Sequence, residues 1–384
     1  MVKRVKNPFI DSGYIGAEYF CDREKESAEL TNSLLNGRNM VIISPRRMGK
    51  TGLIQHCFHQ PKIRNTHYTF FIDIYATGSL RELVFIFGKK IFDTLKPKDK
   101  TFVDKFFAMV SSLRAAFKLD SVTGMPVFDI GISEIYQPER SLEEIFAYLE
   151  SADKPCIVAI DEFQQIAGYP EKNIEAVMRT YIQQCKHTNF IFSGSQRHMM
   201  QNIFFSASRP FYQSAGLINL DPIKPEAYLS FAQKHFKKAG KIISDESIMR
   251  IYYLFEGHTW YMQHLLNRIY AQLDKGEEMT IQYADTILHN VVESYKTVYQ
   301  GMLSTLSERQ KEVLFAIGRQ GKAKEITSAR FVKKYGLNSA SSVQSAIRQL
   351  LEKEFITREG DGYQVYDRFF GLWLSEMYGT GYKL

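Results

Sequence analysis

Cysteine is scarce in this sequence, and no long apolar run occurs. The four cysteines, Cys21, Cys57, Cys156 and Cys185, lie far apart and form no Cys-x-x-Cys pair, which argues against a disulfide framework or a zinc site. No stretch approaches the ~20 apolar residues that cross a bilayer. The basic start, residues 1–6, is not followed by the apolar segment of a signal peptide. We therefore expect a soluble, cytoplasmic protein with no membrane partner.

Charge of one sign is not in strong excess either. The 49 Lys and Arg against 42 Asp and Glu give a net charge of +7 over 384 residues. This mild value permits nucleic acid as a partner without requiring it. The composition, 45% hydrophobic and 24% charged, is that of a globular chain long enough for two or three domains.

Residues 39–222 alternate short β-branched and aromatic runs with amphipathic helical stretches, the pattern of an α/β protein with a parallel sheet. The run at 156–161 is apolar on both faces, so we expect it at the centre of the sheet. A helix is expected to begin near Ser141, with Glu144 completing a capping box. Residues 113–137 show no clear period and are left unassigned. The expected strands are Asn39–Ile43, His67–Tyr75, Cys156–Asp161, Asn189–Ser193 and Leu217–Leu220.

Two further patterns follow the sheet. Helical periodicity over Pro225–Lys238 and Ser247–Asp274 indicates a small helical lid domain. After Ser307, three helical stretches and a hairpin centred on 360–362 describe a winged helix, with the helices expected over 308–319, 328–335 and 341–353. We therefore predict three domains, over residues 1–222, 223–300 and 301–384.

The loop after the first expected strand carries the groups that bind phosphate. Such a site uses backbone N–H groups at a helix N-terminus, a lysine for the β- and γ-phosphates, and a hydroxyl for Mg²⁺. Ser44 stands where the pattern G-x-x-x-x-G-K-[ST] has its first glycine, but Gly49 keeps the glycine nearest the phosphates. We predict ATP as ligand, with Lys50 a solvated charge on the phosphates and Thr51 a ligand of Mg²⁺. The alternative is a basic turn of the same composition. The loop reads Ser44, Pro45, Arg46, Arg47, Met48, Gly49, Lys50, Thr51.

Two carboxylates end the expected strand at 156–161. Asp161 is positioned to hold Mg²⁺ through water, and Glu162 to polarise the water that attacks the γ-phosphate. Buried carboxylates are costly without such a task, although an ordinary acidic turn is the alternative. The next strand ends at Ser193 and Ser195; Ser193 is the first choice for a contact with the γ-phosphate or the water, Ser195 the second, and a solvent-facing turn the alternative.

These motifs resemble those of the archaeal-type P-loop ATPases of the AAA+/STAND group over nearly the whole chain. The resemblance implies an AAA+-like P-loop fold with a helical lid and a C-terminal winged helix, ATP and Mg²⁺ as cofactors, and further nucleotide contacts from Arg23 and Gly52. The similar segments are the N-terminal box Phe20–Glu26, the loop Ser44–Thr51, the Walker B segment Ile160–Gln164, the sensor strand end Phe192–Ser195 and the ending Tyr366–Leu374.

Two segments depart from the family pattern. Gln213 and Ser214 stand where members often carry an arginine, and Arg209 is the nearest candidate for an arginine that acts in catalysis. The segment Gly257–Trp260 replaces a glycine–proline turn, so the sensor role of that proline is not carried over. Both a phosphate-facing His258 and a capped helix start stay open.

Three functions compete at this point. The first is a Mg²⁺-dependent ATPase that drives domain rearrangement, the second a slow STAND-type switch acting on an unknown protein partner, and the third a winged-helix DNA-binding regulator. The candidate catalytic residues favour the first two. Residues 301–384 hold 13 basic and 9 acidic residues, a net +4, so DNA is possible but not favoured. Oligomerisation is possible. The candidate catalytic residues are Glu162, Lys50, Ser193 and Arg209.

Overall fold

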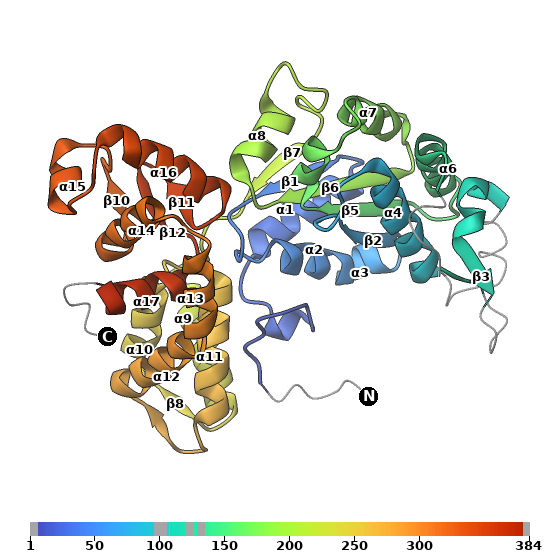
Figure 1. Ribbon diagram of the computed structural model, residues 1–384. Helices are drawn as coiled ribbons and strands as arrows, with labels where there is room; N and C mark the ends of the chain where they lie inside the picture. Colours follow the sequence, from blue (N-terminus) through green and yellow to red (C-terminus); the bar gives the residue numbers. More distant parts are fainter. Residues whose placement is uncertain (1–6, 96–105, 107, 120–125, 129–134, 379–384) are drawn as a thin grey trace. The chain divides into compact units, whose positions relative to one another are not determined.

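The computed structural model describes residues 7–95, 106, 108–119, 126–128 and 135–378 (Figure 1). This part of the chain divides into two compact units. The sheet unit comprises residues 12–228 together with 258–260, and the helical unit comprises 7–11, 229–257 and 261 onward.

The sheet unit is built on five parallel strands in the order β2-β5-β6-β1-β7. All five strand predictions are confirmed to within two residues. Strand β5, expected at the centre, lies inside the sheet beside the edge strand β2, and β6 takes the middle position. The strands are β1 (Met40–Ile43), β2 (Tyr68–Asp73), β5 (Cys156–Asp161), β6 (Thr188–Gly194) and β7 (Gly216–Asn219).

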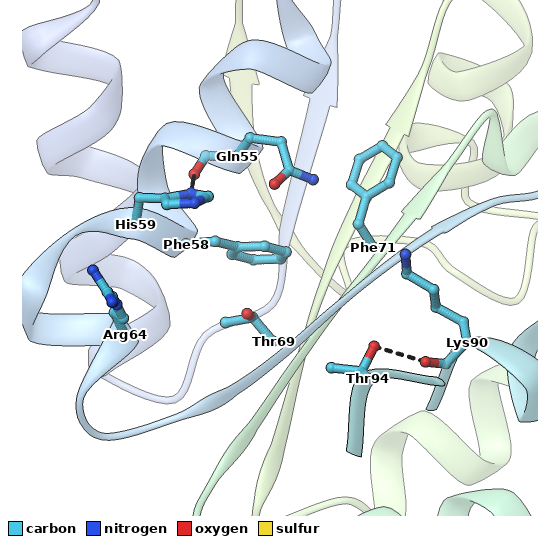
Figure 2. Close-up of a pocket in the computed structure, with 8 residues that line it drawn as sticks. All are labelled: Gln55, Phe58, His59, Arg64, Thr69, Phe71, Lys90 and Thr94. Carbon is cyan, nitrogen blue, oxygen red and sulfur yellow. Dashed lines mark hydrogen bonds between the residues drawn. The ribbon is translucent and has the colours of Figure 1, made fainter. Parts of the chain in front are cut away.

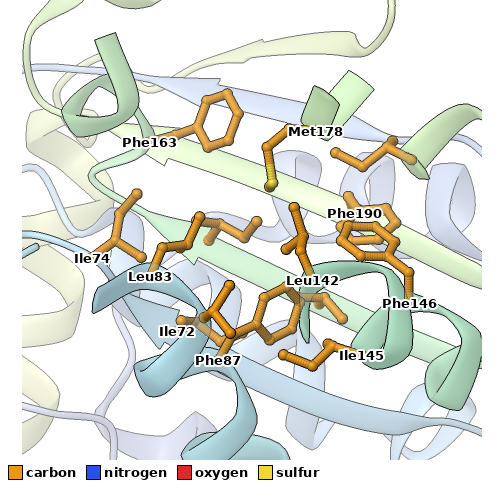
Figure 3. Packing of buried hydrophobic residues seen from close by; sticks show 14 of the residues in the cluster. Ile72, Ile74, Leu83, Phe87, Leu142, Ile145, Phe146, Phe163, Met178 and Phe190 are labelled. Atoms are coloured by element: carbon orange, nitrogen blue, oxygen red, sulfur yellow. The ribbon is translucent and has the colours of Figure 1, made fainter. Parts of the chain in front are cut away.

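Helices cover both faces of this sheet, because successive side chains of a strand point to opposite faces. Val41 and Ile43 pack into the larger core, shown in Figure 3, whereas Met40 and Ile42 pack into the smaller core. The larger core is covered by α4 (Leu80–Leu95), α6 (Pro138–Glu150), α7 (Ile174–Gln184) and α8 (Arg197–Phe205), and the smaller by α1 (Glu24–Leu35), α2 (Lys50–His59) and α3 (Pro61–Arg64).

The predicted capping box at Ser141 is wrong. Helix α6 begins at Pro138, because proline suits the first turn, where no backbone N–H bond is lost. Glu144 instead accepts hydrogen bonds from the Ser112 backbone N–H at 2.9 Å and from its hydroxyl at 2.6 Å. The unassigned stretch 113–137 includes the end of a 3-10 helix, η2 (Ser111–Ala116), and an antiparallel pair of strands, β3 (Phe117–Leu119) and β4 (Pro126–Phe128); residues 120–125 and 129–134 lie outside the described residues.

The lid helices begin with α9, which matches its predicted range. The pattern over Ser247–Asp274 is two helices, because the chain leaves the helix where Glu256 and Gly257 adopt left-handed φ angles of 51° and 70°. Among the described helices, none has the length and apolar character needed to cross a bilayer. The elements are α9 (Pro225–Lys238), β8 (Ile242–Ile243), α10 (Asp245–Leu254), α11 (Thr259–Gln272), β9 (Glu278–Met279), α12 (Ile281–Ser294) and α13 (Lys296–Ser304).

The C-terminal part has the predicted order of three helices and a hairpin. Ser307 and Gln310 form a reciprocal capping box at the first helix. A short strand, β10, adds a third member to the sheet, and a final helix buries Trp373. The elements are α14 (Glu308–Gln320), β10 (Ala323–Lys324), α15 (Ala329–Lys334), α16 (Ala340–Glu352), β11 (Ile356–Glu359), β12 (Gly362–Val365) and α17 (Arg368–Tyr378).

Residues 7–11 pack in the helical unit, whereas the sequence prediction assigned them to the sheet domain. Phe9 is fully buried, with its ring centroid 5.3 Å from that of Phe236 and 5.7 Å from that of Tyr270. Asn267 donates its side-chain amide to the Phe9 carbonyl at 2.6 Å. Apart from the first residues of α9 and α11, the lid helices and the winged helix also fall within this one unit, so the three-domain division stays a prediction.

Candidate active site

The loop between β1 and α2 has the backbone form of a phosphate-binding loop. Gly49 caps α2 with a φ of 92°, a left-handed conformation that glycine adopts without strain. Arg47 is also left-handed, with a φ of 68°. Ser44 is not among the described residues with positive φ, so serine in place of glycine causes no backbone strain there. The first N–H groups of α2, which have no partner within the helix, are therefore available to an anion.

Lys50 is buried in this loop, which contradicts the expectation of a solvated charge. Its side chain is only 6% exposed, and Nζ donates to the carbonyls of Ser44 and Pro45, each at 3.3 Å. Burial lowers the pKa of Lys50; the nearby carboxylates of Glu162 and Asp161 oppose this shift without cancelling it. The loop thus holds a desolvated ammonium group on carbonyl oxygens.

Asp161 accepts hydrogen bonds from two hydroxyl groups at the carboxyl edge of the sheet. Thr51 Oγ1 donates to its Oδ2 at 3.1 Å, and Ser193 Oγ donates to its Oδ1 at 2.6 Å. The three residues come from α2, β5 and β6, which meet because parallel strands end at the same edge. Hydroxyl and carboxylate oxygens are the ligands that Mg²⁺ prefers. The sequence prediction that these residues share one site therefore fits the geometry.

Glu162 is held by three hydrogen bonds to one oxygen. It adopts a left-handed φ of 56°, and its Oε2 accepts from Gln164 Nε2 at 2.5 Å and from the Ser195 N–H and hydroxyl at 3.2 and 2.8 Å. Burial by itself raises the pKa of Glu162, but these bonds and the charge of Lys50 outweigh it and lower the pKa. Of the two candidate serines, Ser193 therefore contacts Asp161, and Ser195 contacts Glu162.

Gln164 is a member of the site that sequence reasoning missed. Its side chain is 2% exposed, and its buried Oε1 has no hydrogen-bond partner among the described residues. A Cβ atom on Gly194 would overlap this oxygen and the Met200 side chain, so a larger residue there would force both side chains to shift. The available signal was an amide two residues beyond an acidic pair, too common a pattern to stand out.

The two arginines of the loop contact other segments of the sheet unit. Arg46 Nε donates to Ser195 Oγ at 3.1 Å, and its guanidinium carbon lies 5.3 Å from the ring centroid of Tyr75. The Arg47 guanidinium carbon lies 4.2 Å from the Trp260 ring centroid, and the Trp260 N–H donates to the Arg47 carbonyl at 3.1 Å. The loop therefore contacts both the end of β6 and the segment 258–260.

Arg23 supports the loop from the N-terminal side. It is 4% exposed, pairs with Glu26 at 2.8 Å, and donates to the Met48 carbonyl at 3.4 Å. The Phe20 ring lies against Gly52, where an added Cβ would be 3.3 Å from it. Met48 itself is buried. These contacts place Arg23 and Gly52 beside the loop, while their contact with a nucleotide stays a prediction.

Arg209 is paired within the chain. Its guanidinium forms an ion pair with Glu175 of α7, and its side chain is 34% exposed. Within the described residues, no hydrogen bond joins Arg209 to Asp161 or Glu162, so the structure does not bring Arg209 together with the carboxylates.

His258 is buried, and it lies in the segment 258–260 of the sheet unit.

A third carboxylate ends the edge strand. Asp73, which sequence reasoning did not single out, is the register partner of Asp161 on the neighbouring parallel strand. Burial raises the pKa of Asp73, and the charges of Asp161 and Glu162 raise it further, whereas the Tyr75 N–H opposes the shift. The carboxyl edge thus concentrates negative charge close to the positive charges of Lys50 and Arg46.

Replacing Ser195 with alanine should lower ATP turnover about tenfold, because a hydrogen bond to a charged group contributes about 1.5–3 kcal/mol. The loss of that bond should also raise the pKa of Glu162. The sequence predicts Glu162 as the base that polarises the attacking water, and a carboxyl group can act in this way only when ionised. The acid limb of the pH–rate profile is therefore expected to move to higher pH. The measurement is turnover against pH, with Ser206→Ala as a control. An acid limb at the wild-type pH would contradict the assignment.

A phosphate-binding loop between β1 and α2, with two successive carboxylates at the end of β5, defines the P-loop class of nucleotide-binding folds. Residues 20–265 match the model of an ATPase domain that is predominantly from Archaea, and residues 297–376 match that of a probable winged helix domain. The chain belongs to this archaeal-type ATPase family. Among curated proteins, no relative matches the sequence.

Solved structures share the fold over nearly the whole chain. A Walker-type ATPase of Pyrococcus abyssi is 17% identical, with 96% of this chain and 99% of that chain covered and a TM-score of 0.65. The ORC2 protein of Aeropyrum pernix, in its ADPNP–ADP complexes, is 12% identical, with 97% and 96% covered and a TM-score of 0.61. The ORC1 protein of the same organism, in complex with DNA, is 12% identical, with 93% of each chain covered and a TM-score of 0.51.

Proposed function

We propose that this protein is a Mg²⁺-dependent ATPase that couples ATP binding and hydrolysis to a rearrangement of its domains. The observation that carries the proposal is the junction of Thr51, Asp161 and Ser193, joined by hydrogen bonds of 3.1 and 2.6 Å beside a loop with a buried lysine. Thr51 and Asp161 offer oxygen atoms to Mg²⁺, directly or through water. The bound ion would neutralise charge on the β- and γ-phosphates.

The residues of the chain divide the remaining work. The N–H groups at the start of α2 bind the phosphate oxygens, and Lys50 exchanges its bonds to the loop carbonyls for bonds to the β- and γ-phosphates. Glu162, ionised through its hydrogen bonds to Ser195 and Gln164, orients the attacking water and accepts its proton as the bond to ADP breaks. Arg209 can act on phosphate only after its ion pair with Glu175 opens.

Asparagine at Asp161 should remove most of the Mg²⁺ dependence of ATP binding. In Mg²⁺ the variant should bind ATP on the order of tenfold more weakly or worse than the wild type, because a charged ligand is lost. In EDTA the variant should bind ATP at least as tightly as the wild type, because a carboxylate that repels the phosphates is gone. The measurement is equilibrium titration under both conditions, with Asp93→Asn, on the exposed surface of α4, as a control. A Mg²⁺ effect as large as that of the wild type would rule out Asp161 as the magnesium residue.

We propose that the contact of Arg47 with Trp260 couples nucleotide binding to the rest of the chain. Trp260 lies in the first turn of α11, whose residues from 261 onward belong to the helical unit. Occupation of the loop by phosphate would therefore act on a residue continuous with that unit. This supports domain rearrangement as the use of the nucleotide.

ATP binding should change the fluorescence of Trp260. The chain has two tryptophans, and the other, Trp373, is buried in the helical unit at 1% exposure. We expect the emission to change on ATP addition in the wild type and in Trp373→Phe, and to stay constant in Trp260→Phe. Titration of the three proteins with ATP measures this. A full fluorescence response in Trp260→Phe would mean that ATP binding at the loop does not act on Trp260.

A DNA-binding function is the second candidate, favoured by the winged helix match at residues 297–376. Helix α16 exposes Gln344, Ser345 and Arg348, which could reach phosphates or base edges. Binding to random duplex DNA that weakens steeply with salt would support this function.

A slow STAND-type switch would instead bind ATP tightly with little turnover. Light scattering in ATP, in ADP and without nucleotide would test for assembly.

A further inference from the structure

A cavity of about 460 Å³ opens in the sheet unit, away from the candidate active site (Figure 2). The residues that line it come from helices α2, α3 and α4 and from strand β2. This volume lies in the range of small-molecule sites, roughly 300–1,000 Å³. The lining residues are Gln55, Phe58, His59, Arg64, Thr69, Phe71, Lys90 and Thr94.

The cavity lies toward the C-terminal end of α2, whose N-terminal end carries the phosphate loop, and toward the N-terminal end of β2. Helix α2 begins at Lys50, in the phosphate loop, and ends at His59, which is ~13 Å farther along the helix axis at 1.5 Å per residue. On β2, Thr69 precedes the carboxyl-end residue Asp73 by ~13 Å of extended chain. A ligand in this cavity is therefore distinct from the ATP of the proposed function.

The lining combines aromatic surface with positive charge. Phe58 is 6% exposed and Phe71 is partly buried, so their rings form apolar walls. Arg64 of α3 and Lys90 of α4 are exposed cations, and Figure 2 shows them on opposite sides of the two rings. No aspartate or glutamate is among the lining residues.

The two cations are available to a ligand. Within the described residues, neither the Arg64 guanidinium nor the Lys90 ammonium forms an ion pair or a side-chain hydrogen bond. By contrast, His59 Nδ1 donates to the Gln55 carbonyl at 2.7 Å, and the Thr94 hydroxyl donates to the Lys90 carbonyl at 2.7 Å. An arginine fork suits carboxylate or phosphate oxygens, and a lysine adds a point charge.

We propose that this cavity binds a small organic anion: a carboxylate or phosphate group attached to a flat apolar body. The apolar body packs against Phe58 and Phe71, and the anionic group bonds to the cation on its side of the rings, either Arg64 or Lys90. Thr69 and Gln55 add polar groups that orient the ligand. Apolar walls with a few polar groups that fix orientation are the usual design of such sites.

The test uses the full chain with saturating Mg²⁺ and ADP, which occupy the phosphate loop. Phenyl phosphate, benzoate and uncharged benzyl alcohol are titrated, and binding is followed by saturation-transfer NMR. We expect at least one anion to bind about tenfold more tightly than the alcohol. The anion that binds more tightly assigns the ligand class, phosphate or carboxylate.

Arg64→Ala with Lys90→Ala should weaken binding of the preferred anion about tenfold or more. A matched control, Lys62→Ala with Lys89→Ala, removes the same charge from exposed positions of α3 and α4 outside the lining and should bind the anion like the wild type. All four residues are exposed, so both variants should fold. The proposal is overturned if neither anion binds, if the alcohol binds equally well, or if both double variants weaken binding alike.

Discussion

Glu162→Gln is expected to lose ~10²-fold or more of the ATP turnover rate, about 2.7 kcal/mol of barrier, while ATP and Mg²⁺ affinity stay near wild type. The glutamine side chain is nearly isosteric, and its carbonyl oxygen can accept the bonds that Ser195 and Gln164 now donate to Oε2. Only the negative charge, which is proposed to polarise the attacking water, is lost. The measurement is steady-state phosphate release at saturating ATP and Mg²⁺, together with nucleotide affinity.

A control for this variant is Glu29→Gln, an exposed position of α1 in the same unit, which should keep wild-type turnover. Equal turnover in Glu162→Gln and the wild type would mean that the carboxylate has a structural task. The protein would then be a nucleotide-binding switch with little catalysis.

Lys50→Ala is expected to weaken ATP binding ~100-fold or more. Lys50 is 6% exposed, and its ammonium group lies in the loop proposed to bind the phosphates. Its loss would remove two or more charged hydrogen bonds to ATP, of about 1.5–3 kcal/mol each. Fluorescence titration with a labelled ATP analogue measures the affinity. Lys25→Ala, an exposed position of α1, is the control and should bind normally.

The fold of the Lys50→Ala variant should survive. Burial lowers the pKa of Lys50, which shows that desolvation works against its charge, and removing that charge relieves this cost. The same change leaves Asp161 and Glu162 without their nearest ammonium group, so the two effects oppose each other. Thermal unfolding should therefore give a similar transition for both proteins. Unchanged ATP affinity would contradict the site assignment.

The sequence was sufficient for features that depend on local patterns. Strand β5 matches its predicted range, because an apolar run followed by two carboxylates has few other readings. The phosphate loop was predictable because the chemistry requires Gly49, Lys50 and Thr51 in that order. Helix α14 was predictable from its period and its capping residues.

Features that depend on packing between distant segments were not predictable. The solvent exposure of Lys50 depends on how the loop closes around it, and the division of work between Ser193 and Ser195 depends on the left-handed turn at Glu162. The contact of Arg47 with Trp260 joins residues more than two hundred positions apart. No spacing rule along the chain encodes such contacts.

We propose that ATP is hydrolysed in a Mg²⁺-dependent reaction at the junction of Thr51, Asp161 and Ser193, with Glu162 as the base. The most direct test of this proposal is a single-turnover experiment with protein in excess over γ-labelled ATP, in Mg²⁺, in EDTA, and after Mg²⁺ is restored. Single turnover detects hydrolysis even where product release is slow. We predict phosphate release in Mg²⁺, background release in EDTA, and recovery when Mg²⁺ returns. Hydrolysis at the same rate in EDTA, or none in Mg²⁺, would contradict the account.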